Sequence, residues 1–285
     1  MELGNDLVVF QHYNVKQDGI IEDCVSNIGE YEFDGVEKKQ KFYLQILLKY
    51  GIGWEAWSRM YRRDIIERQH LRFADNRRIF AEDLYFNICY CLDIARLQSI
   101  GDKLYYYRFR DGSIMNKQAR NINAGRMNEL SKEVYDYFLQ HKAPDEIMQV
   151  FPAMHYLILL NCIQNFKKAN GIDGIRIRRY IQEDIQDWSY FSEMLGRMER
   201  TNEWRRYFSR PEAVHMRKVA NYWRTGNIPM FALKTAKVNY LSGEQELKRI
   251  IAVKTVKKHK SKVFYLGSET FGNLGDGMIA ETIMA

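Results

Sequence analysis

The sequence predicts an α/β region, then a mainly α-helical region, and then a strand–turn–helix stub at the C-terminus. Three observations predict this order. Short runs of β-branched and aromatic residues, which favour strands, occur within the first 110 residues. Beyond residue 120 the apolar positions recur at helical spacing. Residues 263–268, VFYLGS, form one more strand-like run, which a glycine-rich turn and a helix start follow.

The first elements of the α/β region are a hairpin and a helix. Residues 6–13 predict a strand, because they are β-branched, aromatic and few. A turn signal at 17–20 and a weaker extended segment behind it predict that the chain doubles back. Residues 36–50 have amphipathic helical spacing, and Gly51, a usual helix-stop residue, predicts where that helix ends.

The later elements of this region are shorter. We expect a short helix at 62–69, an extended piece at 71–75 and a helix at about 82–95. Residues 96–100 and 103–110 are typical of strands, and the Gly-Asp pair between them predicts a tight turn.

The terminal stub is too small to stand alone. One strand and about three helical turns cannot bury a core, since a parallel strand needs neighbours and covering helices. We therefore expect the chain to be cut through a domain at this end, and a first strand that enters without a preceding βαβ unit suggests the same at the start. The predicted parts are 1–119, 120–235, 236–261 (a basic linker) and 262–285.

Composition favours an anionic partner and a reducing compartment. The formal net charge is +7, and residues 254–262 form a basic run. Such a run is either a solvated face or a contact for phosphate or for an anionic membrane surface. The four cysteines show no disulfide framework, and the histidines form no zinc-binding pair. With neither a signal peptide nor a membrane-length apolar run, we expect a cytoplasmic protein with peripheral membrane contact at most, and no nucleic-acid partner.

Two adjacent acids, Glu82 and Asp83, stand at the start of an apolar helical stretch. Acids in a first helical turn stabilise a helix by about 0.3–1 kcal/mol through its dipole, which needs no functional explanation. A carboxylate in this place can also accept a proton from a substrate. The two residues alone leave both readings open.

The neighbouring segments add a resemblance. GWEAWSRMYRRDII (53–66), LRFAD (71–75), AEDLYF (81–86) and LYYYRFRDGSIM (104–115) occur in this order. They resemble the acceptor-side half of family 2 glycosyltransferases of the GT-A fold, and NDLVVF from residue 5 resembles the strand that follows the family's metal-binding DxD. The resemblance covers about 110 residues, and the chain contains no DxD.

The resemblance implies roles for the acids and the tryptophans. Asp83 would be the base that deprotonates the acceptor hydroxyl, and Glu82 would contact the acceptor. Trp54 and Trp57 would form an apolar wall for the acceptor sugar, or else they are ordinary core residues. As in the family, the partners would be a nucleotide-sugar and a glycan or lipid-linked acceptor.

The closing segment would bind the donor diphosphate. Arg108 and Arg110 are two apart on a predicted strand and so share a face, where they bind a diphosphate or are solvated. Ser113 would order the same loop. In many relatives a histidine that helps to hold the metal occupies the position of Arg110, and arginine cannot ligate a cation. We therefore expect Mg²⁺ or Mn²⁺ in the complete parent enzyme and no metal ligands in this chain.

A second, shorter resemblance concerns residues 262–283. The strand and the GNxGD turn with Asn273, Gly275 and Asp276 resemble the opening of polysaccharide pyruvyl transferase domains. Such a turn offers backbone N–H groups and a helix N-terminus to an anion, although it also serves as a plain connection.

The expected function is that of a fragment of an inverting glycosyltransferase in surface polysaccharide synthesis. Without a DxD half the chain alone is expected to be inactive in sugar transfer. The alternatives are a non-catalytic binding or scaffold module, in which the helical region docks a partner, and part of a pyruvyl transferase.

Overall fold

The computed structural model describes residues 4–15, 21–24, 27–108, 121–172, 174 and 176–227. The chain divides into two compact units, Met1–Tyr207 and Phe208–Ala285. The predicted parts 236–261 and 262–285, with Asn273, Gly275 and Asp276, lie outside the described residues, as do Arg110 and Ser113. The four-part division predicted from the sequence stays a prediction.

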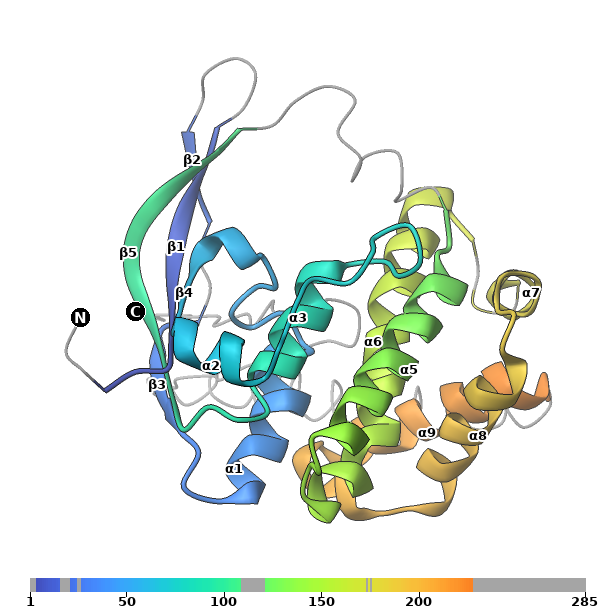
Figure 1. Cartoon of the computed structure of the whole chain (residues 1–285). Coiled ribbons are helices and arrows are strands. Elements are labelled where there is room, and N and C mark those ends of the chain that lie inside the picture. The colour runs from blue at the N-terminus through green and yellow to red at the C-terminus, as the bar shows by residue number, and fades with distance from the viewer. Residues whose placement is uncertain are drawn as a thin grey trace, which may run out of the picture. The chain divides into compact units, whose positions relative to one another are not determined.

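The first unit contains a mixed sheet of five strands (Figure 1). The strand order is β2-β1-β5-β3, and β4 also pairs with β1. β1 and β5 run parallel, whereas every other pairing is antiparallel, including the predicted β1–β2 hairpin. The strands are β1 (Leu7–Val15), β2 (Ile21–Cys24), β3 (Gly29–Glu32), β4 (Arg59–Tyr61) and β5 (Arg96–Arg108).

The prediction of two strands separated by a Gly-Asp turn is wrong. β5 is one strand of 13 residues, and the Gly101–Asp102 pair lies inside it. Between the partners Val9↔Ser99 and Gln11↔Lys103, β5 holds extra residues that have no counterpart on β1. The glycine therefore marks a bulge, a common role of glycine in a strand interior. The paired neighbour β1 keeps the chain running in one direction.

Helices lie beside this sheet. The predicted helix at 36–50 is α1 (Val36–Lys41), which continues as a π-helical stretch, Phe42–Leu47. The predicted short helix is α2 (Arg63–Arg68), and the predicted helix at 82–95 is α3 (Glu82–Tyr90), which ends earlier than expected. Residues 71–75 form no strand.

The helical region follows as predicted. Its helices in the first unit are α5 (Ala124–Gln140), α6 (Asp145–Asn170), α7 (Ile177–Asp184) and α8 (Trp188–Arg200). α5 packs against α6 and α3, so the helical region and the α/β region share one core (Figure 1). An α/β region followed by a mainly helical one is thus confirmed.

α6 is the central helix of this core. Among the described helices, it alone has the length and apolar composition to cross a membrane, and 72% of its most apolar stretch is buried inside the molecule. Its buried face includes Phe151, Tyr156 and Ile158. Core helices of this kind pass the same length and composition test as membrane spans.

The described part of the second unit contains α9 (Arg210–Thr225). Its ends follow ordinary capping chemistry. The Ser209 hydroxyl accepts a hydrogen bond from the N–H of Glu212, and Pro211 lies in the first turn. Gly226, at φ 70°, ends the helix in the left-handed conformation that glycine adopts at little cost.

Candidate active site around Asp83

The acid pair lies in the first turn of α3, next to a strained residue. Ala81 precedes the helix with φ 65° and ψ 63°, a left-handed conformation that is costly for a residue with a Cβ. Its carbonyl accepts hydrogen bonds from Leu84 and Tyr85. Leu84 and Ile79 are fully buried on either side. The first turn of α3, with Glu82 and Asp83, therefore begins directly after a left-handed residue.

Asp83 is half-buried, and its carboxylate reaches the loop that carries the tryptophans. Asp83 Oδ2 accepts a hydrogen bond of 3.2 Å from the backbone N–H of Ala56. Burial raises the pKa of Asp83, and the nearby charges of Glu82 and Glu55 raise it further. The Ala56 hydrogen bond and the Arg59 guanidinium oppose this rise. Asp83 therefore holds a proton more tightly than an ordinary aspartate.

Asn87, one turn further along α3, ties the helix to the same loop. Its side-chain amide donates hydrogen bonds to the backbone carbonyls of Asp83 (2.7 Å) and Trp54 (2.8 Å). Its Oδ1 accepts one of 2.9 Å from the Tyr61 hydroxyl. Asn87 is completely buried, so these bonds rigidly position the acid-bearing turn against the tryptophan loop.

The buried Arg59 binds the backbone of the loop that carries Trp54 and Trp57. The guanidinium of Arg59 donates to the carbonyls of Ile52 (3.2 Å), Gly53 (2.6 Å) and Glu55. These bonds compensate for burying the cation, which is only 6% exposed. Arg59 therefore fixes the loop, and its positive charge lowers the pKa of Asp83.

The two predicted tryptophans have different surroundings. Trp57 stacks with Tyr105 at 4.5 Å between ring centroids and with Tyr107 at 5.4 Å. His12 meets its ring edge-on at 4.8 Å. We call these four residues the aromatic wall. Because Trp57 adjoins Ala56, the wall begins one residue from the hydrogen-bond donor to Asp83.

The indole N–H of Trp54 fixes this side chain in place. Its indole N–H donates a hydrogen bond of 2.6 Å to the carbonyl of Leu47, and its ring meets Tyr50 edge-on at 5.1 Å. Both contacts face the end of the π-helical stretch. Trp54 therefore holds the loop in place and remains only partly exposed.

Of the predicted diphosphate-binding residues, the structure describes Arg108 alone. Arg108 is exposed at the last position of β5, where it is paired with Val15 across the sheet. The structure therefore brings Glu82, Asp83 and the two tryptophans together through one loop and one helix turn. No described contact joins Arg108 to Asp83.

Sequence reasoning missed several residues of this site. Asn87 had a usable signal, since it lies four residues after Asp83 and hence on the same helix face. Glu55 lies between the two tryptophans, where its charge raises the pKa of Asp83. Burial lowers the pKa of His12, and Glu55 opposes that effect. His12 and Tyr105 had no local signal, because only the β1–β5 pairing brings them to Trp57.

The described residues also bear on metal binding. Within the described ranges, no three or more side chains of His, Cys, Asp or Glu are grouped so that they can hold a metal ion. The expected divalent cation of a complete enzyme is not tested by this.

Comparison with known proteins gives one informative similarity. No family model matches the chain. An uncharacterized glycosyltransferase of Bacillus subtilis strain 168, EpsJ, is 28% identical over 110 residues, which are 38% of this chain and 32% of that protein. The match thus spans about a third of the relative's length. At this level the chain is similar to a glycosyltransferase, and the pyruvyl transferase resemblance stays a prediction.

Proposed function

We propose that this chain is the acceptor-side part of an inverting glycosyltransferase, with Asp83 as its general base. The observation that carries the proposal is the Asp83 carboxylate, half-buried, with a raised pKa, and held beside the aromatic wall by the Ala56 N–H. Perturbed carboxylates next to a place where a substrate can lie are typical of catalytic acids and bases. The similarity to a glycosyltransferase supports the reaction class.

In the proposed reaction an acceptor hydroxyl attacks the anomeric carbon of a nucleotide-sugar. Asp83 Oδ takes the hydroxyl proton as the new C–O bond forms, and the bond from the anomeric carbon to the diphosphate breaks. The nucleoside diphosphate leaves from the opposite face, so the anomeric configuration inverts. The raised pKa of Asp83 favours its acceptance of the proton.

The aromatic wall would hold the acceptor. The C–H face of a sugar ring packs on aromatic side chains, and Tyr105, 40% exposed, is the accessible member of the wall. We propose that Glu82, adjacent to the base, accepts hydrogen bonds from the same sugar. The acceptor would be a glycan or a lipid-linked sugar of a surface polysaccharide.

The nucleotide-sugar donor would be bound mainly by a part of the enzyme that carries a DxD motif. A divalent cation would stabilise the leaving diphosphate in a complete enzyme, and a DxD motif, absent from these 285 residues, usually holds it. We therefore expect the chain on its own to show little sugar transfer. Arg108, Arg110 and Ser113 remain candidates for contact with the diphosphate.

The test is sugar transfer by the longest protein that contains these residues together with a DxD motif, with and without Asp83→Asn. We expect the rate to fall by a factor of at least ~100 while acceptor binding is retained, since general bases contribute about 10²–10⁴-fold. Asp64→Asn, an exposed acid on α2, serves as the control. Unchanged transfer in Asp83→Asn would favour a non-catalytic role for the acid pair, and robust transfer by the isolated chain would contradict the need for a separate donor half.

A further inference from the structure

A cavity of about 430 Å³ lies on another side of α3. Its volume falls within the range of about 300–1,000 Å³ that is usual for small-molecule sites. Its walls come from the segment between α2 and α3, from α3 itself and from α5. Its charged, imidazole and exposed aromatic lining residues include His70, Arg72, Phe73, Arg78, Glu133 and His141.

This cavity is separate from the candidate active site. Tyr85 of α3 lines the cavity, and Asp83 lies two residues before it on the same helix. Positions two apart on a helix point about 200° apart, so the two side chains leave opposite faces. Asp83 faces the tryptophan loop through Ala56, whereas the cavity lies towards α5.

Two arginines bring positive charge to the cavity. Arg78 forms an ion pair with Glu133 of α5 at 2.7 Å, and Arg72 forms one with Glu67 at 3.1 Å. Both arginine side chains are more than 60% exposed, so solvent or a ligand can reach them. A guanidinium has five N–H donors in a planar fork, and one carboxylate oxygen occupies only part of that set.

Histidine and aromatic side chains form the remaining walls of the cavity. His141 stacks on Tyr137 at 4.0 Å, and the Tyr137 hydroxyl donates to Gln69 at 3.2 Å, so this wall is fixed in place. His70 is exposed at the end of α2 in a left-handed conformation, φ 49°. Phe73 stacks on Phe86 at 4.3 Å yet remains 52% exposed.

We propose that this cavity binds a small ligand that carries a phosphate group. Arg72 and Arg78 each pair with one carboxylate, which leaves further guanidinium N–H groups to donate to a ligand, and the two histidines add N–H donors. Planar guanidinium groups match the oxygens of a phosphate in bidentate geometry. Phe73 and Tyr85 offer apolar surface to the organic part of such a ligand.

Glu133 decides how tightly an anion binds. Its carboxylate occupies Arg78 and repels a phosphate, and its burial already raises its pKa. Removal of this charge would release Arg78 to the ligand. Loss of the Glu133 charge should therefore strengthen anion binding, whereas loss of the Arg78 charge should weaken it.

The test is calorimetric titration of the whole chain with inorganic pyrophosphate and with glucose 1-phosphate at constant ionic strength. We expect saturable binding that Arg78→Gln weakens by about tenfold, a typical effect of losing one charge-assisted contact. Glu133→Gln should tighten binding several-fold. Arg77→Gln is the matched control, because Arg77 is adjacent, 88% exposed, paired with Asp75 and outside the lining.

A second arm identifies the source of the phosphate. Sedimentation with phosphatidylglycerol and with phosphatidylcholine vesicles tests a lipid headgroup, again in Arg78→Gln and Arg77→Gln. Arg78-dependent binding to the soluble phosphates assigns a free ligand, and Arg78-dependent binding to the anionic vesicles alone assigns a headgroup. Absence of saturable binding in both arms, or equal loss in Arg78→Gln and Arg77→Gln, would overturn the proposal. Circular dichroism of each variant confirms that it is folded.

Discussion

Asp83 accepts a hydrogen bond from the backbone N–H of Ala56, 27 residues away in the sequence. This single contact joins the first turn of α3 to the loop between two tryptophans. It places the acid pair against the aromatic wall, and it gives the acid a partner that does not neutralise its charge.

Replacement of Asp83 by Asn should stabilise the fold at neutral pH. The folded state raises the pKa of Asp83, so it disfavours the carboxylate. Below the pKa of the unfolded chain both states are protonated and the charge costs nothing, whereas above the folded pKa the full cost is present. The stabilisation should therefore appear as the pH rises above about 4, in urea unfolding at several pH values. A variant less stable than the parent at pH 7 would contradict the assigned surroundings.

The aromatic wall should bind sugar through one face of β5 only. Tyr105 stacks on Trp57, whereas the next residue, Tyr106, stacks on Tyr13 across the strand pair. Tyr105→Ala should weaken binding of oligosaccharide acceptors by about fivefold, in line with the loss of one aromatic contact.

Tyr106→Ala is the matched control, since it removes the same side chain from the same strand. Saturation-transfer NMR on an oligosaccharide panel measures both variants. Equal weakening in the two variants would show that the wall has no preferred face for sugar.

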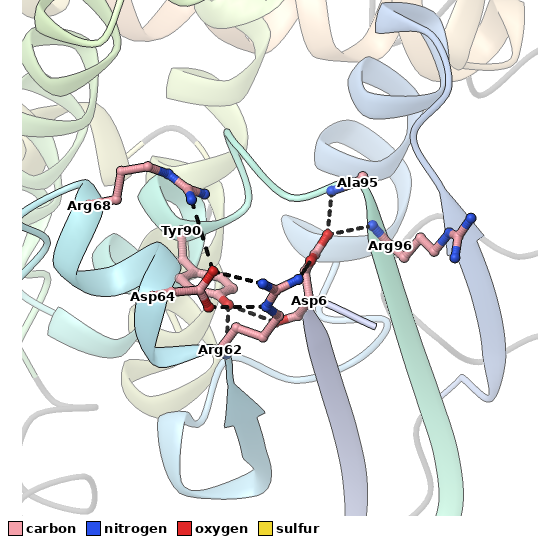
Figure 2. A network of polar contacts seen from close by, with 7 residues as sticks. All are labelled: Asp6, Arg62, Asp64, Arg68, Tyr90, Ala95 and Arg96. Carbon is pink, nitrogen blue, oxygen red and sulfur yellow. Dashed lines mark hydrogen bonds and ion pairs between the residues drawn. The ribbon is translucent and has the colours of Figure 1, made fainter. Parts of the chain in front are cut away.

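The start of β1 should depend on Asp6, which is 8% exposed. Figure 2 shows its carboxylate accepting from the backbone N–H groups of Ala95 (2.7 Å) and Arg96 (3.0 Å), while the Tyr90 hydroxyl donates to its carbonyl (2.6 Å). Asp6→Ala takes the charged acceptor away from these two part-buried backbone N–H groups and also removes an ion pair of 3.2 Å with Arg62. We expect a loss of about 3 kcal/mol in the free energy of unfolding, measured by urea.

Asp64→Asn is the control for Asp6. Asp64 pairs with Arg62 and Arg68 in the same network (Figure 2), but its side chain is 52% exposed. Exposed ion pairs contribute little, so the urea midpoint should barely change. A loss as large as that of Asp6→Ala would mean that the ion pairs, not the two backbone N–H groups, hold this junction.

A buried histidine should make the fold acid-sensitive. His155 is fully buried, its Nδ1 lies 2.8 Å from the Ser131 hydroxyl, and burial lowers its pKa to about 3. Stability is complete above the unfolded pKa of about 6.5 and is lost as the pH falls towards the folded pKa. The loss between pH 6.5 and 4.5 should be on the order of 2 kcal/mol.

His155→Gln removes this titration. Urea midpoints of the parent and the variant should converge as the pH falls from 7 to 4.5, because only the parent takes up the proton on unfolding. Parallel curves for the two proteins would refute the assignment to His155.

Much of the fold followed from local sequence. The β1–β2 hairpin, the start of α3 and the helical region beyond residue 120 were predicted because capping, turn and periodicity signals are carried by neighbouring residues. The same signals placed Glu82 and Asp83 in a first helical turn. They failed at Gly101–Asp102, where a turn signal lies inside β5.

The tertiary structure decided what local signals cannot encode. Sequence alone did not decide whether Asp83 only stabilises the helix start through the dipole or also acts as a base. Its raised pKa comes from burial and from the charge of Glu55, and both depend on a loop that is distant from Asp83 in the sequence. The pairing of β1 with β5 makes Gly101 part of a β-bulge. It also places Tyr105 and Tyr106 on opposite faces of the sheet. Sequence determined which segments form helices and strands, and long-range packing determined which of their side chains meet, since burial and pairing energies act between residues that no short pattern connects.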